Sequence, residues 1–164
     1  MKLTEDEKYM KIALRKAREA SRRGEVPVGC VIVRDGRIIS YGRNTREAKQ
    51  SALAHAELNA IGKACRKLGS WRLCGCDLYV TLEPCPMCAG AILNARIRRV
   101  IWGAPDKKAG AYGSVGDMSA FDMNHTVLVT GGVLADECAD VISDFFRTLR
   151  VEKKKPVNND SGDE

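Results

Sequence analysis

The chain of 164 residues lacks any long uninterrupted apolar run. A membrane-spanning helix needs about 20 consecutive apolar residues, and no segment of the sequence approaches that length. The first residues, from Met1 to Asp6, also lack the apolar core of a secretory signal peptide. We therefore expect no membrane partner and a protein that stays in the cytoplasm.

The cysteine content argues against a disulfide framework. There are seven cysteines, an odd number, and no secretion signal accompanies them. Such a composition indicates reduced thiols and a metal site. Cys30, Cys65 and Cys138 are expected to be small, buried, apolar residues.

Length and charge narrow the remaining possibilities. A chain of 164 residues is the size of one domain and can bury a substantial core. We expect residues 1–151 to form this single domain and the polar residues 152–164 to form a disordered tail. The formal net charge of +6 and the pI near 9.0 suit a polyanionic partner such as a nucleic acid.

Hydrophobic periodicity predicts alternating helices and strands. A capping box at Thr4 and Glu7 starts a first helix that ends near Gly24, and Asp35-Gly36 is typical of a two-residue hairpin turn. Helices are also predicted at residues 55–68, from residue 85, and at 135–150. Strands are predicted at 28–33, 37–41, 77–82, 100–102 and 126–130. The strand, helix and strand from residue 77 to residue 102 imply a parallel pair, and residues 104–124 form an irregular loop.

Two short motifs carry the predicted chemistry. Ala-His-Ala-Glu holds His55 and Glu57, and Pro-Cys-Pro-Met-Cys holds Cys85 and Cys88. Proline is tolerated in the first turn of a helix, so a helix should begin at Cys85, and the two cysteines at positions i and i+3 then share one face. The positive end of the helix dipole favours the thiolate form that zinc requires. Both sulfurs can therefore bind one metal ion.

The motifs together supply a Cys₂His ligand set and a free carboxylate. With His55 as third ligand, the fourth position of a tetrahedral zinc ion stays open for water, whereas structural zinc sites usually close with four protein ligands. Glu57 lies two residues after His55, so it is better placed beside that water than on the metal. We predict that Glu57 is the general acid/base of a catalytic zinc site.

A non-catalytic alternative uses the same ligands. A zinc ion that only stabilises the fold of an RNA-binding protein would need a fourth protein ligand, for which Cys74, Cys76 and His125 are available. Such a protein has no need for the carboxylate of Glu57 beside its metal. The number of protein ligands therefore distinguishes this alternative from an enzyme.

The H-x-E and P-C-x-x-C motifs are similar to those of zinc-dependent deaminases of nucleobases. Segments at residues 25–29, 81–85, 132–134 and 145–150 further resemble bacterial tRNA-specific adenosine deaminases, within the cytidine deaminase-like superfamily. The resemblance covers nearly the whole chain. It implies an α/β fold, built as a three-layer α/β/α sandwich with a five-stranded mixed sheet. It also implies one zinc ion per subunit and a homodimer that binds the tRNA anticodon stem-loop.

By this resemblance, the reaction is the hydrolytic deamination of adenosine to inosine at the wobble position of tRNA. Asn44, carried over by position, would hydrogen-bond the flipped base. The backbones of Ala56 and Glu83 would line the pocket, and His125 would border the nucleotide channel. The superfamily also acts on free guanine, cytosine and nucleosides, and a free nucleobase or nucleoside is the alternative substrate.

One segment departs from the family pattern. Many members carry Asp-Pro-Thr before the Ala-His-Ala-Glu motif, where this chain has Ser51-Ala52-Leu53. The departure changes the loop before the first predicted metal ligand and leaves the ligands and the acid/base intact. It therefore bears on the choice between tRNA and a free base as substrate.

The predicted C-terminal helix combines an apolar stripe with a basic end. Val141, Phe145 and Leu149 recur at i, i+4 spacing and should pack on the sheet. Arg147 and Arg150 lie beside this stripe, and by resemblance this end contacts the tRNA. The alternative is that both arginines belong to a solvated helix end, and the same choice applies to the basic residues of the first helix.

Overall fold

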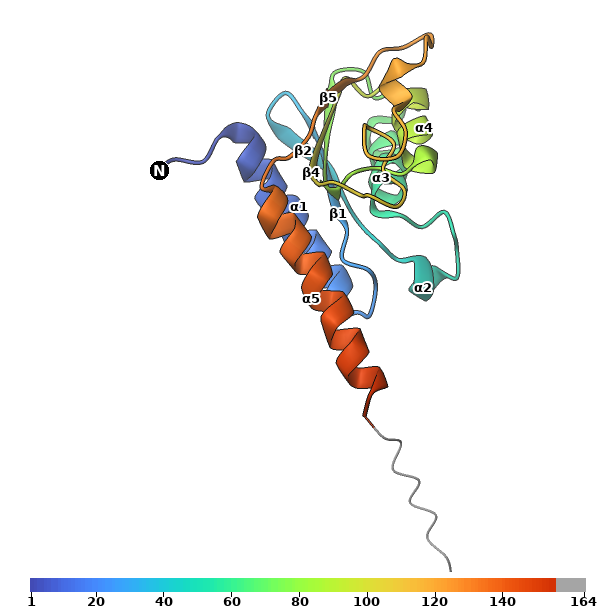
Figure 1. The fold of residues 1–164 in the computed structure, drawn as a ribbon. Coiled ribbons are helices and arrows are strands. Elements are labelled where there is room, and N and C mark those ends of the chain that lie inside the picture. The colour runs from blue at the N-terminus through green and yellow to red at the C-terminus, as the bar shows by residue number, and fades with distance from the viewer. Residues whose placement is uncertain (156–164) are drawn as a thin grey trace, which may run out of the picture.

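A five-stranded mixed sheet lies at the centre of the computed structural model, which describes residues 1–155 (Figure 1). The strands are β1 (Gly29–Arg34), β2 (Arg37–Arg43), β3 (Cys76–Leu82), β4 (Arg99–Ala104) and β5 (Leu128–Thr130). Their order across the sheet is β2-β1-β3-β4-β5. β1 is antiparallel to both of its neighbours, whereas β3, β4 and β5 run parallel. The five-stranded mixed sheet and the parallel pair are therefore confirmed.

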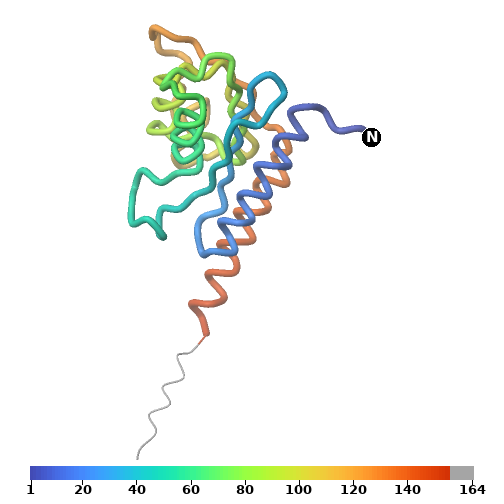
Figure 2. Tube along the Cα trace, turned by 180° about the vertical axis from the view of Figure 1, so that it is seen from behind, coloured from blue at the N-terminus to red at the C-terminus, as the bar shows by residue number. Residues whose placement is uncertain are grey.

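Helices cover both faces of this sheet. α1 (Glu5–Arg22) and α5 (Ala135–Lys153) lie side by side on one face, and α3 (Ala56–Leu68) and α4 (Pro86–Asn94) cover the other (Figures 1 and 2). The short helix α2 (Arg46–Lys49) and the 3₁₀ helix η1 (Met118–Ala120) lie in connecting segments. The result is the expected three-layer α/β/α arrangement. Within residues 1–155, every helix is too short or too polar to cross a bilayer.

Local signals explain where these elements begin and turn. The Thr4 side chain accepts a hydrogen bond from the backbone N–H of Glu7, and the Glu7 carboxylate accepts one from the Thr4 N–H, so the predicted capping box starts α1. Asp35 and Gly36 both have positive φ, at 51° and 71°. This conformation is that of the tight turn that joins two antiparallel strands, and it places β1 beside β2.

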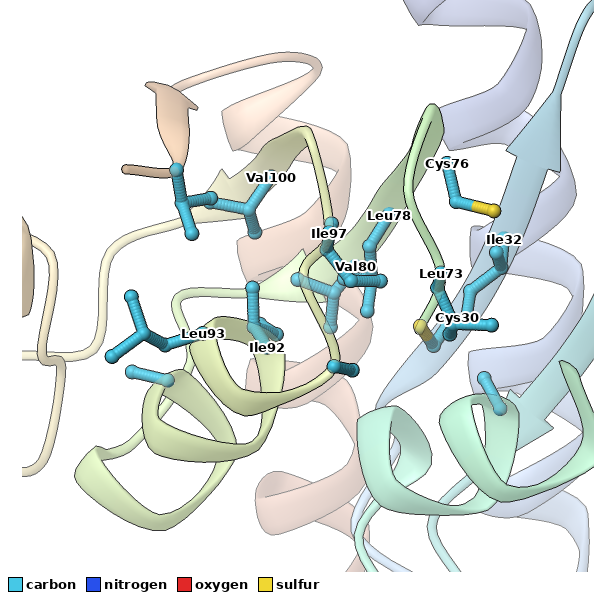
Figure 3. Close-up of a cluster of buried hydrophobic side chains, with 14 of the residues drawn as sticks. Cys30, Ile32, Leu73, Cys76, Leu78, Val80, Ile92, Leu93, Ile97 and Val100 are labelled. Carbon is cyan, nitrogen blue, oxygen red and sulfur yellow. The ribbon is translucent and has the colours of Figure 1, made fainter. Parts of the chain in front are cut away.

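The central strands are apolar on both faces. Side chains alternate between the faces of a strand, so Cys30 and Ile32 of β1 join Leu78 and Val80 of β3 under α3 and α4, together with Ile92 of α4 (Figure 3). The intervening side chains face α1 and α5: Val31, Val33, Tyr79 and Ile101. Burial on both faces explains why the sequence shows continuous apolar runs here.

Two glycines bring helices unusually close to the sheet. A Cβ atom at Gly29 would lie 1.9 Å from the carbonyl oxygen of Ala13 in α1, and one at Gly42 would lie 2.0 Å from that of Ala56 in α3. Neither distance is possible for a real side chain. The strands therefore contact both helices through bare backbone, and Gly42 sets the position of the first turn of α3.

Several predicted boundaries need correction. The polar segment before His55 contains α2, which was not predicted, and β5 starts at Leu128. α5 continues through Lys153, so the predicted start of the tail at residue 152 falls inside a helix, because Glu and Lys are good helix formers despite their polarity. The remaining tail, residues 156–164, lies outside the described residues. Cys30 and Cys138 are buried as predicted, whereas Cys65 is partly exposed.

Candidate active site

The two sequence motifs meet at one end of the sheet because each stands at the start of a helix. His55 is the N-cap residue of α3, and Cys85 is the N-cap residue of α4, with Pro86 in the first turn as predicted. Neither N-cap side chain bonds the backbone of its own helix. Both side chains are therefore available to a shared ligand.

The three predicted metal ligands lie together. His55 Nδ1 is 3.7 Å from Cys85 Sγ and 3.5 Å from Cys88 Sγ, and the three ligand atoms all lie within 4.8 Å of one another. A tetrahedral zinc ion with Zn–S bonds of about 2.3 Å and a Zn–N bond of about 2.0 Å places sulfur and nitrogen about 3.5 Å apart. The donors and their spacing therefore fit zinc, with Nδ1 as the histidine ligand atom.

Within residues 1–155, no fourth His, Cys, Asp or Glu joins this cluster. Cys74 is exposed, and Cys76 is at the start of β3, whereas the metal motif follows the other end of that strand. His125 Nε2 lies 2.7 Å from the carbonyl oxygen of Ile97. The candidates for a closed structural site are thus all elsewhere, and the fourth metal position remains open.

The two thiols affect each other's protonation. The hydrogen bond from Cys88, helped by the one to His55, lowers the pKa of Cys85 to about 4 although the thiol is half-buried. The same hydrogen bond and burial raise the pKa of Cys88 far above its ordinary value. The pair therefore holds one proton, which a metal ion displaces on binding.

Glu57 lies in the first turn of α3, next to Cys88, and only 4% of it is exposed. Burial raises the pKa of its carboxyl group to about 7, against the opposing effects of a backbone N–H and of His55. A general acid/base works best when its pKa lies near the working pH. The carboxyl group can therefore both give and take a proton beside the metal position.

A cavity of about 230 Å³ opens beside Glu57. This is smaller than the roughly 300–1,000 Å³ typical of pockets for drug-sized ligands, so it suits a single flat ring system. Apolar and polar side chains from five separate segments line it: Val26, Val28, Asn44, Arg46, His55, Ala56, Glu57, Leu82, Glu83, Cys85, Asp106 and Ala109.

Asn44 lines this cavity with part of its amide already bonded. Its Oδ1 accepts a hydrogen bond of 3.1 Å from the backbone N–H of Arg46, and its Nδ2 donates one of 3.2 Å to the carbonyl oxygen of Val26. The first bond is the local turn that asparagine commonly forms. Because Nδ2 carries two hydrogens, one N–H remains for a ligand in the cavity.

Ala56 and Glu83 also line the cavity, and the side chain of Glu83 has a role that the sequence did not predict. Its carboxylate accepts hydrogen bonds from the backbone N–H groups of Asp106, Tyr112 and Ser114 and from the Ser114 hydroxyl. Burial raises the pKa of this carboxyl group, but the hydrogen bonds outweigh burial and lower it overall. The sequence spacing gave no signal for donors so far along the chain.

The remaining predicted residues lie away from this cavity. His125 lines a separate small cavity with Tyr112 and Phe121. Arg147 and Arg150 are exposed on α5, which covers the face of the sheet opposite to α3 and α4. Arg147 pairs with Asp144.

The segment that departs from the family pattern, residues 51–53, also contributes nothing to the cavity lining. It forms a turn in which Ser51 Oγ accepts a hydrogen bond of 3.3 Å from the Leu53 N–H, and Leu53 is largely exposed. The residues that depart from the family pattern are therefore not part of the cavity walls.

An open Cys₂His cluster, a buried carboxyl group and a base-sized cavity define the site of a zinc-dependent hydrolytic deaminase. Residues 3–104 match the family model of the cytidine and deoxycytidylate deaminase zinc-binding region. The chain belongs to this family, and its metal is zinc.

Individual relatives extend this match to nearly the whole chain. A tRNA-specific adenosine deaminase of Bacillus subtilis is 48% identical over 158 residues, which cover 96% of this chain and 98% of that protein. One from Haemophilus influenzae is 48% identical over 151 residues, covering 91% and 87%. A solved structure from work on A-to-I editing by tRNA:A34 deaminases at the wobble position is also similar, with a TM-score of 0.76 and 44% identity over 82% of this chain and 98% of that one.

Proposed function

We propose that this protein hydrolytically deaminates adenosine to inosine at the wobble position of a tRNA. The observation that carries the reaction type is the buried carboxyl group of Glu57 beside an open Cys₂His cluster. The substrate class rests on the two relatives at 48% identity, both of which are named tRNA-specific adenosine deaminases. The formal net charge of +6 supports a polyanionic substrate.

The chemistry replaces the amino group at C6 of adenine by an oxygen, so that one water is consumed and one ammonia is released. His55, Cys85 and Cys88 would hold the zinc ion, which would supply the acidity that activates a water near neutral pH. Glu57 accepts one proton of the attacking water and passes it to ring nitrogen N1, where it stays in the product. It then carries the second proton, from the new hydroxyl on C6, to the amine, which departs as ammonia. A pKa of about 7 suits this exchange in both directions.

Recognition of the base falls to the cavity. A base reaches a buried site only after it leaves its stack, which costs least in a single-stranded loop. The free N–H of Asn44 can donate to an acceptor on the purine, and the apolar side chains of Val26, Val28 and Leu82 contact the ring. The backbone N–H of Ala56, in the first turn of α3, is a further donor without an intrahelical partner.

We further propose that the enzyme is a homodimer. Val115, Phe121, Met123 and Leu128, on the loop before β5 and on that edge strand, are between 47% and 63% exposed. Exposed apolar groups gathered on one segment are typical of an association surface. Analytical ultracentrifugation should give twice the chain mass of 18.0 kDa, and Phe121→Asp should shift the protein toward monomer. A monomeric wild type would contradict the proposal.

Two further parts of the proposal concern location and organisation. All seven cysteines are free, as suits a reducing cytoplasm where tRNA is found. Residues 1–151 act as one catalytic domain, since α1 and α5, from opposite ends of the chain, contact each other on the same face of the sheet.

The decisive experiment incubates the purified protein with an arginine tRNA that carries adenosine at the wobble position. Wild type should form inosine there, and Glu57→Ala, the matched control, should not. Free guanine, cytosine and adenosine are tested in parallel. Ammonia release from free bases, without inosine in the tRNA, would overturn the substrate assignment and support a nucleobase deaminase.

A further inference from the structure

Two buried carboxylates have no cationic partner within residues 1–155: Glu83, which lines the cavity, and Glu25, which precedes the lining residue Val26. Glu25 and Glu83 are each 2% exposed, and neither forms an ion pair within residues 1–155. A buried charge is costly unless hydrogen bonds compensate it. In both cases the compensation comes from backbone N–H groups of a segment far along the chain, so each carboxylate fastens one such segment to the body of the protein.

Glu83 fastens the loop of residues 106–114. Its Oε2 accepts the N–H of Asp106 at 3.0 Å, and its Oε1 accepts the N–H groups of Tyr112 at 3.0 Å and of Ser114 at 3.1 Å. The Ser114 hydroxyl donates a further bond to Oε2. The donors lie at both ends of the loop, so a single carboxylate closes it.

A glycine in the same loop gives independent evidence for this wrapping. A Cβ atom at Gly110 would lie 2.3 Å from Glu83 Oε2 and 2.4 Å from its Cδ. The φ of this glycine is not in the left-handed region, so its missing side chain serves the close approach and not an unusual backbone angle. The loop therefore encloses the carboxylate as tightly as backbone atoms allow.

Glu25 fastens α2 in the same manner. Its Oε2 accepts the N–H of Glu47 at 3.1 Å, and its Oε1 accepts the N–H of Ala48 at 2.7 Å. α2 has only four residues, and an isolated helix of that length is not stable in water. Its position therefore depends on contacts with the rest of the protein. Glu25 supplies two of them, beside the bond from the Arg46 N–H to Asn44 Oδ1.

Both fastened segments contribute to the cavity. Asp106 and Ala109 line it from the loop, and Arg46 lines it from α2. Surface segments such as these are mobile unless they are tied to the scaffold. The two carboxylates thus act on the two walls of the cavity that lie outside the sheet and its covering helices.

We infer that Glu83 and Glu25 are positioning residues, which hold loop 106–114 and α2 in the conformation that receives the target nucleotide. Glu83 is itself among the lining residues and Glu25 is not, and the carboxylates of both act through the segments that they fasten. The identity of the nucleotide rests on the proposed function. How firmly loop 106–114 and α2 are held can be measured by hydrogen exchange without any substrate.

The first measurement is amide hydrogen exchange in Glu83→Gln and Glu25→Gln. Glutamine keeps the size of the side chain but turns one acceptor oxygen into an NH₂ group that faces N–H donors. Loss of such a buried hydrogen bond should speed exchange by about tenfold or more. Glu83→Gln should do so at Asp106, Tyr112 and Ser114, and Glu25→Gln at Glu47 and Ala48. Each variant serves as the control for the other segment.

The second measurement separates positioning from mere stability. Each variant should keep its zinc and raise the KM for a minimal anticodon stem-loop by about tenfold, with a smaller change in kcat. Asp77→Asn is the matched control, since Asp77 is a buried carboxylate at the opposite end of β3 that pairs with Arg98 at 2.9 Å. It should lower the Tm but leave the KM and the exchange of both segments unchanged.

A milder variant covers the case in which Glu83→Gln does not fold. Ser114 is exposed, and Ser114→Ala removes only the hydroxyl donor, so exchange at Asp106 and Tyr112 should rise by a smaller factor. Wild-type exchange and KM in folded variants would overturn the inference. A wild type that forms no inosine would instead defeat the proposed function, and the exchange result would still decide the role of the two carboxylates.

Discussion

The helices on the two faces of the sheet are used differently. α3 and α4 both begin at the cavity, and the residues at their starts supply His55, Glu57, Cys85 and Cys88. Within the described residues, α1 and α5 contribute nothing to the cavity lining, although they bury an apolar cluster of similar kind. The comparison teaches that the residues at the start of a helix supply the chemistry here. The apolar face along a helix supplies stability by packing on the sheet.

The largest expected effect comes from removing the acid/base at the start of α3. Glu57→Ala should lower turnover by about 10²- to 10⁴-fold, the usual contribution of a positioned proton carrier, while zinc content and fold are kept. Glu137→Ala is the matched carboxylate on the other face, where it pairs with Lys11. Its turnover should equal that of wild type, as measured by inosine formation. Retained activity in Glu57→Ala would overturn the assigned role.

Removing a thiol on each face of the sheet should lower the zinc content on one face only, that of α3 and α4. Cys85→Ala should lose most of its zinc and its activity, since two ligands hold the ion poorly. Cys138→Ala, which removes a buried thiol of α5 itself, should keep a full equivalent of zinc. Elemental analysis of both proteins provides the test. A full equivalent of zinc in Cys85→Ala would require a different ligand set.

Gly29 under α1 and Gly42 under α3 are a matched pair that tests whether only the α3 side of the sheet affects activity. Gly29→Ala should push α1 away from β1, and Gly42→Ala should push α3 away from β2, each costing about 1–3 kcal/mol of unfolding free energy. Only Gly42→Ala displaces Ala56, the neighbour of His55, so only this variant should lose kcat/KM beyond what its stability explains. Chemical denaturation and steady-state kinetics measure the two quantities. Equal kinetic losses in both would contradict the division between the faces.

Acid should weaken the contribution of Glu83 to stability. The pKa of this carboxyl group is lowered in the folded protein from its ordinary value of 4.5. Its ionised form therefore stabilises the fold above pH 4.5, and this contribution is lost as the pH falls through the lowered folded-state pKa. The Tm difference between wild type and Glu83→Gln should have its largest value near neutral pH and decrease below pH 4.5. A difference that is constant with pH would exclude ionised Glu83 as its source.

The smallest effect is expected on the α1 and α5 face. Replacing Arg147 and Arg150 by Ala should weaken tRNA binding by a few-fold at low salt and lower the salt slope by about 1 to 2. The paired change of Arg34 and Arg37 to Ala, on the β1–β2 hairpin, controls for net charge. Binding measured across salt concentrations tests this. An unchanged slope would assign both arginines to the solvated surface.

The sequence predicted the metal cluster because its signals are local. Proline beside Cys85 and the i, i+3 spacing to Cys88 fix a helix start, and His55 begins the other helix. The prediction that Phe145 packs against the body of the protein is likewise confirmed, since Phe145 is buried while its neighbour Phe146 is 41% exposed. Helical periodicity contains this information without any knowledge of distant contacts.

The rim of the cavity could not be predicted in the same way. The donors to Glu83 and Glu25 are backbone N–H groups, which every residue except proline carries, so no residue type marks them. α2 is too short to show periodicity, and its N–H groups are bonded by the distant side chain of Glu25 and by Asn44. His125 was expected beside the nucleotide channel from its position in the sequence. Sequence position does not give the direction of a side chain, and the ring of His125 is turned toward the carbonyl oxygen of Ile97.

The length of α5 has a consequence for how the enzyme meets its substrate. The helix has 19 residues, and its far end extends beyond the sheet, with Phe145 as its last buried residue (Figure 1). Arg147, Arg150 and Lys153 are exposed on this part of the helix. Charges in such a position act on the rate of diffusional encounter more than on the lifetime of a complex. We expect the end of α5 to set how often a tRNA is captured, and the cavity to decide which tRNA is retained.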